Sequence, residues 1–150
     1  MGFDLTGLNP NLTRPEPELP PMPERTSKHW EIYTDWQEEN CGTYFRNNVW
    51  GWRPLWNFVT AMCNDFLTEK DIEQGCYNDG HKISKTKARR IAARIRRCLK
   101  DEYADVYDSW YAMKQKNLPD DDWGKNYPFN VDNVIAFERF CENSGGFRIY

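Results

Sequence analysis

The sequence predicts a mostly α fold: a compact helical domain of five or six helices that follows an extended, Pro-rich N-terminal arm. Three observations support this fold class. Six of the nine prolines lie in residues 10–23, apolar residues recur at helical spacing along most of the chain beyond them, and aromatic residues make up 15% of the 150 residues. Large rings supply the core that a disordered chain lacks, and a chain of this length fits one domain.

The arm is expected to cover residues 1–26, and the single helical domain residues 27–150. Prolines remove backbone donors and bias their neighbours toward extended conformations, so the arm is not expected to be helical. Apolar residues such as Leu8, Leu12 and Met22 indicate that the arm lies along a surface, either of its own chain or of a neighbouring copy. In the second case the protein would be a homo-oligomer.

The first helix is expected to begin at Ser27, a residue type that suits the N-cap position. The apolar segment 44–66 is typical of a buried helix, but Pro54 lies inside it. A proline deletes one helical hydrogen bond and pushes the preceding residue out of the α region. We therefore expect two helices here, at about 43–51 and 54–66.

Further along the chain, Thr68 and Asp71 resemble a capping box for a short helix that ends at Gly75. The clearest helix runs over about 85–99, where the apolar residues occupy an arc of roughly 120° and the remaining surface is basic. Aromatic residues at helical spacing predict another helix that extends to Lys116.

The C-terminal part of the chain is expected to hold one last helix over about 131–142, between Asn130 and Gly145. The tail 147–150 alternates between apolar and polar residues, which is compatible with a short strand. A strand needs a partner, and the helical fold class provides none.

Charge is distributed unevenly behind the net value of −3: residues 1–50 carry −4, residues 51–100 carry +6 and residues 101–150 carry −5. The positive charge of the middle third lies mainly on the helix expected at about 85–99. This basic helix can neutralise the phosphates of a nucleic acid or a nucleotide. It can also pair with the acidic flanks, although exposed ion pairs stabilise little. The candidate basic patch comprises Lys85, Arg89, Arg90, Arg94, Arg96 and Arg97.

Segment 44–57 interleaves arginine and asparagine with tryptophan. On one continuous helix, Arg46, Trp50 and Arg53 would lie within about 60° of one another, with Asn57 beside them. Arginine holds phosphate in bidentate fashion and indoles stack on nucleobases, but a packed aromatic core explains the same pattern. The candidate ligand-binding residues are Arg46, Asn47, Trp50, Trp52, Arg53 and Asn57.

Catalytic signals are weak, because His29 and His81 lie far apart and neither has a cysteine at zinc-ligand spacing. We therefore expect no enzymatic activity, no metal site and no cofactor. The chain shows no signal peptide and no apolar run near the ~20 residues that cross a bilayer, which predicts a cytoplasmic protein without a membrane partner. The five cysteines are then reduced thiols.

Four groups of residues carry a resemblance to a known family: MGFDL and GLNP in 1–10, YFRNNVW and WRPLW in 44–56, NDG in 78–80 and SGGF in 144–147. In this combination the chain resembles a family of small uncharacterised proteins encoded by phages and prophages. Gly51 departs from the family pattern, which has a third tryptophan there. The resemblance brings neither an activity nor site residues with it.

The resemblance implies a counter-defence role in the cytoplasm of a host cell. On that basis we expect a non-enzymatic protein that sequesters a phosphorylated, nucleotide-like signal. One alternative is a protein inhibitor that docks on a host defence protein through the basic helix or the arm. A second alternative is nucleic-acid binding through the basic helix.

Overall fold

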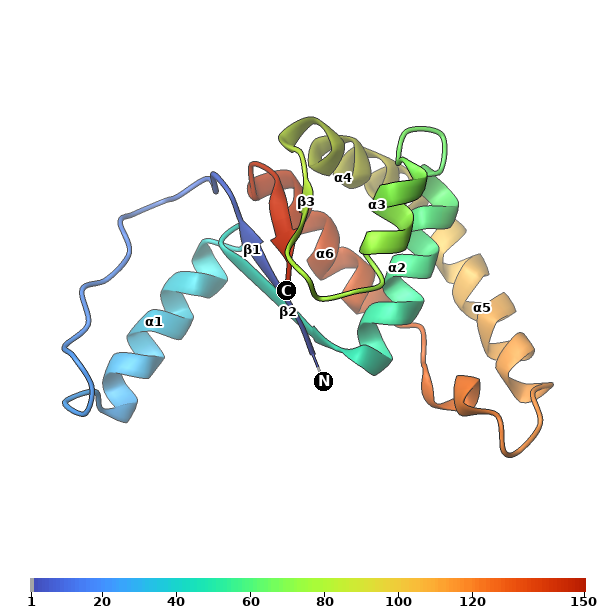
Figure 1. The fold of residues 1–150 in the computed structure, drawn as a ribbon, viewed down its shortest axis with the longest axis horizontal. Helices are drawn as coiled ribbons and strands as arrows, with labels where there is room; N and C mark the ends of the chain where they lie inside the picture. Colours follow the sequence, from blue (N-terminus) through green and yellow to red (C-terminus); the bar gives the residue numbers. More distant parts are fainter. Residues whose placement is uncertain (1) are drawn as a thin grey trace.

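The computed structural model describes residues 2–150, so Met1, the first residue of the expected arm, lies outside the described residues. Over this range, six α-helices accompany a four-stranded antiparallel sheet (Figure 1). The expectation of a mostly α fold is therefore wrong. Helices hold most of the residues, but a sheet lies at the centre of the molecule and contributes to its core.

The sheet joins segments from both ends of the chain. Strand β1 (Gly2–Gly7) lies between β2 (Tyr44–Asn48) and β4 (Phe147–Ile149). Phe3 is paired with Asn47 of β2, and Leu5 is paired with Ile149 of β4. The two chain ends therefore lie near each other (Figure 1). From one edge to the other, the strands are β2 (Tyr44–Asn48), β1 (Gly2–Gly7), β4 (Phe147–Ile149) and β3 (His81–Ile83).

Strand β1 corrects the expected arm. Phe3 and Leu5 are buried whereas their neighbours in the strand are more exposed, which is the period-2 pattern of a strand with one face on the core. Extended backbone was predicted for this segment, but its burial was not. The partners of β1 lie about 40 and 145 residues away along the chain, beyond the reach of local patterns. The Pro-rich segment that stays outside the sheet is 8–26.

The expected helix pair at 43–51 and 54–66 is also wrong. Tyr44–Asn48 forms β2, with alternating exposure, and a single helix α2 (Val49–Cys63) continues through Pro54. Pro54 removes the N–H that would bond to the Trp50 carbonyl, so the cost is one hydrogen bond near the start of the helix. Tertiary burial of α2 outweighs that cost, because its inner face is almost fully covered.

The remaining helices follow the predictions closely. Ser84 caps α4, where its hydroxyl accepts a hydrogen bond from the Lys87 N–H at 3.3 Å. Glu102, with a φ of 56°, separates α4 from α5. These helices are α3 (Glu69–Gln74), α4 (Lys85–Lys100), α5 (Tyr103–Lys116) and α6 (Val131–Asn143), with a short 3-10 helix η1 (Trp123–Asn126) before α6.

The core lies between the sheet and helices α2, α4 and α6. Inward side chains of the strands pack against inward side chains of these helices, and α6 runs behind the strands in Figure 1. The fully buried large residues are Phe3, Leu5, Trp52, Leu55, Trp56, Phe58, Ile83, Ile91, Ile95, Phe137, Phe140 and Phe147.

A projection stands away from this body (Figure 1), formed by residues 12–26 and α1 (Ser27–Glu39), whereas the backbone N–H groups of Leu8, Asn9 and Asn11 still donate to carbonyls of residues 143–146. The N-cap of α1 is Thr26, one residue before the expected position. Trp36 is the buried residue of α1, and its indole N–H donates to the Arg14 carbonyl at 3.1 Å. The arm therefore folds back on α1 of its own chain.

Candidate ligand-binding site around Arg53

The junction between β2 and α2 sets up the site. The Asn48 side chain accepts a hydrogen bond from the Gly51 N–H at 2.8 Å and so caps α2. From this start, Trp50, Arg53 and Asn57 follow at intervals of three and four residues on the less buried side of the helix. The opposite side of α2 enters the core.

Two of the six candidate residues lie in β2 instead of α2, which corrects the expected helical face. The Arg46 guanidinium lies 3.5 Å from the Asp4 carboxylate, and the Asn47 amide donates to the Asn133 side chain at 2.9 Å. The Tyr44 hydroxyl also bonds to Asp4, and partial burial together with this carboxylate raises the pKa of Tyr44 to about 12. Arg46 therefore already has an anionic partner.

Trp52 is a core residue, which corrects its expected role in stacking on a ligand. Its ring centroid lies 5.5 Å from that of Phe3 and 5.3 Å from that of Trp56, and both pairs are stacked. Its indole N–H donates to the Gly75 carbonyl at 2.8 Å. Both faces of the ring are therefore covered by other residues.

Arg53 differs from Arg46 because it forms no ion pair with any carboxylate of residues 2–150. Its guanidinium lies 5.6 Å from the centroid of the Tyr127 ring, and one N–H donates weakly to the Tyr127 hydroxyl at 3.4 Å. Placing the exposed Arg53 cation over an aromatic face is favourable, yet it leaves most of the guanidinium donors available.

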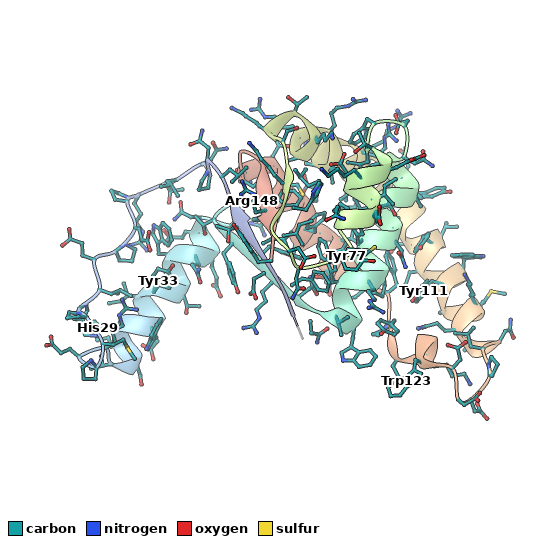
Figure 2. All side chains as sticks on the ribbon, viewed as in Figure 1. His29, Tyr33, Tyr77, Tyr111, Trp123 and Arg148 are labelled. Atoms are coloured by element: carbon teal, nitrogen blue, oxygen red, sulfur yellow. The ribbon has the colours of Figure 1, made fainter. Side chains whose placement is uncertain are left out.

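Trp50 joins this group from the same helix. Its ring lies 4.7 Å from Tyr127 and stacks on Trp123 at 6.4 Å, and 72% of the Trp123 side chain is exposed. The sequence did not indicate Trp123 or Tyr127, although a tryptophan in an otherwise polar loop was the available signal. Figure 2 labels Trp123 at the surface, on η1.

A cavity of about 290 Å³ lies on the other side of Arg53. Gly75 packs against Trp56, one of its lining residues: a Cβ there would lie 2.1 Å from the Trp56 ring, and only glycine lets the backbone approach so closely. Tyr77, labelled in Figure 2, is half exposed beside it. The lining residues are Trp52, Arg53, Trp56, Asn57, Cys76 and Tyr77.

The lining of this cavity offers side chains that can hold a ligand. None of the lining residues is a histidine, aspartate or glutamate. Burial raises the pKa of the Cys76 thiol, although the Arg53 charge offsets part of that rise, so the thiol is protonated at neutral pH. The cavity therefore offers a guanidinium, an amide and a phenol, all of which hold ligands without a chemical step.

Two other hollows fit a phosphorylated ligand less well. One of about 360 Å³ on α5 is lined by Met62, Tyr103, Val106, Tyr107 and Trp110 and contains no cation. A hollow of about 540 Å³ between α1 and α6 contains one cation, Arg139, but also Glu38, whose carboxylate repels phosphate.

A buried cluster around Asp71 has a structural role. Burial alone would raise the pKa of Asp71, but hydrogen bonds from Lys87, Thr68 and His81 outweigh it and hold the pKa well below its usual range. The His81 ring nitrogen lies 2.9 Å from the carboxylate, and Lys87 contacts the other oxygen. The cluster ties α3, β3 and α4 together and opens into no cavity described above.

Comparison with known proteins adds no assignment: no protein-family model, no curated protein and no solved structure matches this chain. Within the described residues, no helix is both long and apolar enough to cross a membrane. No three His, Cys, Asp or Glu side chains of residues 2–150 gather as a set of metal ligands. The site around Arg53 thus rests on its own geometry.

Proposed function

We propose that this protein is a non-catalytic binding protein that holds a phosphorylated, nucleotide-like ligand beside Arg53. One observation carries the proposal: the Arg53 guanidinium lines a cavity and lies over the half-buried Tyr127 ring, without a carboxylate partner in residues 2–150. An arginine in that setting binds a negatively charged group of a ligand. Phosphate fits its planar fork, which donates two parallel hydrogen bonds.

The neighbouring side chains supply the other contacts that a nucleotide needs. Tyr77 exposes a ring on which a base can stack, and the Asn57 amide can donate and accept hydrogen bonds at a base edge. The volume of about 290 Å³ falls at the lower end of the usual range for small-molecule pockets. A single nucleotide suits it better than a dinucleotide.

Sequestration is the role that fits such binding. A site that holds a nucleotide, has no carboxylate or histidine in its lining and keeps its Cys76 thiol protonated lowers the free concentration of the ligand without consuming it. Together with the resemblance to phage-encoded proteins, this supports a counter-defence role in the cytoplasm of a host cell.

A thermal-shift screen tests the proposal with mononucleotides, cyclic mononucleotides, cyclic dinucleotides and NAD-derived nucleotides as probes. A ligand at about 100 times its Kd stabilises the folded state by about 2.7 kcal/mol, which is about 5–10 °C for a chain of this size. Arg53→Ala should remove the shift. Arg46→Ala is the matched control, because Arg46 is an exposed arginine outside the cavity lining.

Two results would contradict nucleotide binding at Arg53. The wild-type protein could show no shift with any of these probes, or Arg53→Ala and Arg46→Ala could respond to a probe equally. Arg53→Lys adds a finer distinction. It keeps the charge but loses the fork, so bidentate phosphate binding predicts a weakened shift, whereas simple charge attraction predicts an unchanged one.

One observation favours a second candidate function, inhibition of a host defence protein through the arm. The projection exposes large apolar side chains, with Leu12 51%, Met22 69% and Trp30 45% exposed. Such residues on a projecting segment suit a protein interface. The test uses an immune host that expresses this chain. If the arm inhibits a defence protein, Trp30→Ser restores immunity to phage and Arg53→Ala does not. If the protein sequesters a nucleotide, Arg53→Ala restores immunity and Trp30→Ser does not.

A further inference from the structure

The cations of α4 fall into two groups that the sequence does not distinguish. The first group faces neighbouring elements and is neutralised there. Arg94 holds Asp65 with two nitrogens at 3.0 and 2.9 Å, and Arg96 bonds to Glu138 at 2.6 Å and to Glu142 at 3.1 Å. Lys87 contacts the buried Asp71 carboxylate. These three side chains are occupied by the fold.

The second group, here named the outer row, faces solvent. Arg97 lies 3.7 Å from Asp101 but is 82% exposed, and the other members form no ion pair within residues 2–150. At about 100° per residue the members share an arc of roughly 140°, and they span about 22 Å of helix. The outer row comprises Lys85, Arg89, Arg90, Arg97 and Lys100.

One member of the outer row is held in place by an aromatic ring. The Arg90 guanidinium lies 4.2 Å from the centroid of Phe66, and the Arg94 guanidinium lies 5.6 Å from the same ring. Stacking on a ring face holds the plane of the guanidinium and leaves its edge donors free. Part of the ordering that anion binding needs is therefore already present in the fold.

We infer that the outer row of α4 is a binding site for the phosphodiester backbone of a nucleic acid. A row of cations at intervals of one or two helical turns matches a ligand with regularly repeated negative charge better than a compact anion. No acidic side chain occurs in α4 itself, and within residues 2–150 the one carboxylate paired with the outer row is that of Asp101, beside Arg97. This site is separate from Arg53 and does not depend on the nucleotide proposal.

The binding is independent of base sequence. A row of cations contacts mainly phosphates, and phosphate contacts carry no sequence information. The exposed residues between the outer-row cations are Thr86, Ala93 and Arg96. Arg96 is held by Glu138 and Glu142, and the other two have small side chains that let a backbone approach the helix. Since DNA and RNA carry the same phosphodiester, the backbone chemistry alone does not choose between them.

Fluorescence anisotropy with a labelled 20-base-pair DNA duplex, the corresponding single strand and an RNA of the same sequence tests this inference. Four or five neutralised phosphates predict a slope of about −3.6 to −4.5 for log affinity against log salt on the duplex, and a shallower slope of about −0.7 per contact on single strands. A second duplex of unrelated sequence should bind equally. The oligonucleotide that binds with the highest affinity identifies the kind of nucleic acid.

The variants compare equal changes of charge at two places. Arg89→Ala, Arg97→Ala and Lys100→Ala combined should reduce the duplex slope by about three units, because each contact contributes about one. Lys28→Ala, Lys114→Ala and Lys116→Ala combined remove three exposed cations elsewhere and should leave the slope unchanged. An unchanged melting temperature in both triple variants excludes unfolding as the cause of a loss.

Several outcomes would overturn the inference. The wild-type protein could fail to bind all three nucleic acids at 50 mM salt up to about 100 µM, the weak limit of non-specific binding. The two triple variants could lose affinity equally, which would indicate a general effect of net charge. Arg53→Ala could abolish oligonucleotide binding while the outer-row variant retains it, which would place the contact at Arg53 and separate the two proposals.

Discussion

Asp4 and Tyr150 exchange two backbone hydrogen bonds: the Asp4 N–H donates to the Tyr150 carbonyl at 2.7 Å, and the Tyr150 N–H donates to the Asp4 carbonyl at 2.8 Å. This pair closes the sheet between strands from opposite ends of the chain. Closing a loop of this sequence separation costs conformational entropy, which the packing of the intervening helices against the sheet offsets.

We predict that the short β4 strand contributes strongly to stability. Ile149→Ala should lower the free energy of unfolding by about 3 kcal/mol, since it leaves a cavity at a fully buried position between strands and helices. Urea unfolding at neutral pH measures this value. Ile135→Ala, on the exposed side of α6, is the control and should cost less than about 1 kcal/mol. Equal losses would show that β4 is not part of the core.

Asp71 should make stability dependent on pH. Its folded-state pKa is depressed below the ordinary value of 3.8, so the stability that it contributes is present above that value and is lost as the pH falls toward the folded pKa. Asp71→Asn should cost about 3 kcal/mol at pH 7, the low end for a broken buried pair, because Lys87 loses its buried partner but is itself partly exposed. The gap between wild type and variant should narrow below about pH 4.

Urea unfolding between pH 7 and pH 3 follows this gap. Asp65→Asn is the matched control, since Asp65 also pairs with a cation of α4 but is half exposed. It should have the smaller effect at pH 7. A difference between wild type and Asp71→Asn that stays constant down to pH 3 would contradict the assignment.

Gly75 is predicted to tolerate no side chain. Gly75→Ala should lower the free energy of unfolding by about 1–3 kcal/mol, because the added methyl group would lie 2.1 Å from the Trp56 ring and both the ring and the turn must shift. Tryptophan fluorescence during thermal unfolding records the change. Gly2→Ala, where the nearest atom lies at 3.4 Å, should have little effect.

The junction of α4 and α5 offers a stabilising substitution. Glu102 has a φ of 56°, in the left-handed region that glycine adopts without strain, so Glu102→Gly should raise the free energy of unfolding by about 0.5–1 kcal/mol. Asp101→Gly, one residue earlier with a φ of −87°, should lower it instead. Urea unfolding measures both changes, and the prediction is wrong if both substitutions change the free energy of unfolding in the same direction.

The candidate site was only partly predictable. Trp50, Arg53 and Asn57 follow helical spacing on α2, so local periodicity was enough to group them. Arg46 and Asn47 were grouped with them because the same spacing continues through residues that turn out to be a strand. Tyr77 reaches the cavity from a turn about 20 residues farther along the chain, which no local pattern reveals.

The sequence by itself determined the features that depend on neighbouring residues: the capping box of Thr68, the cap of α4 at Ser84, the apolar stripe of α4 and the end of α6 before Gly145. Tertiary structure alone decided the sheet, because a strand is defined by a partner and the partners of β1 lie in other parts of the chain. Tertiary structure also decided which cations of α4 remain available to bind a ligand. Arg94 and Arg89 belong to one continuous basic run in the sequence, and only the packing of Asp65 against Arg94 makes them chemically different.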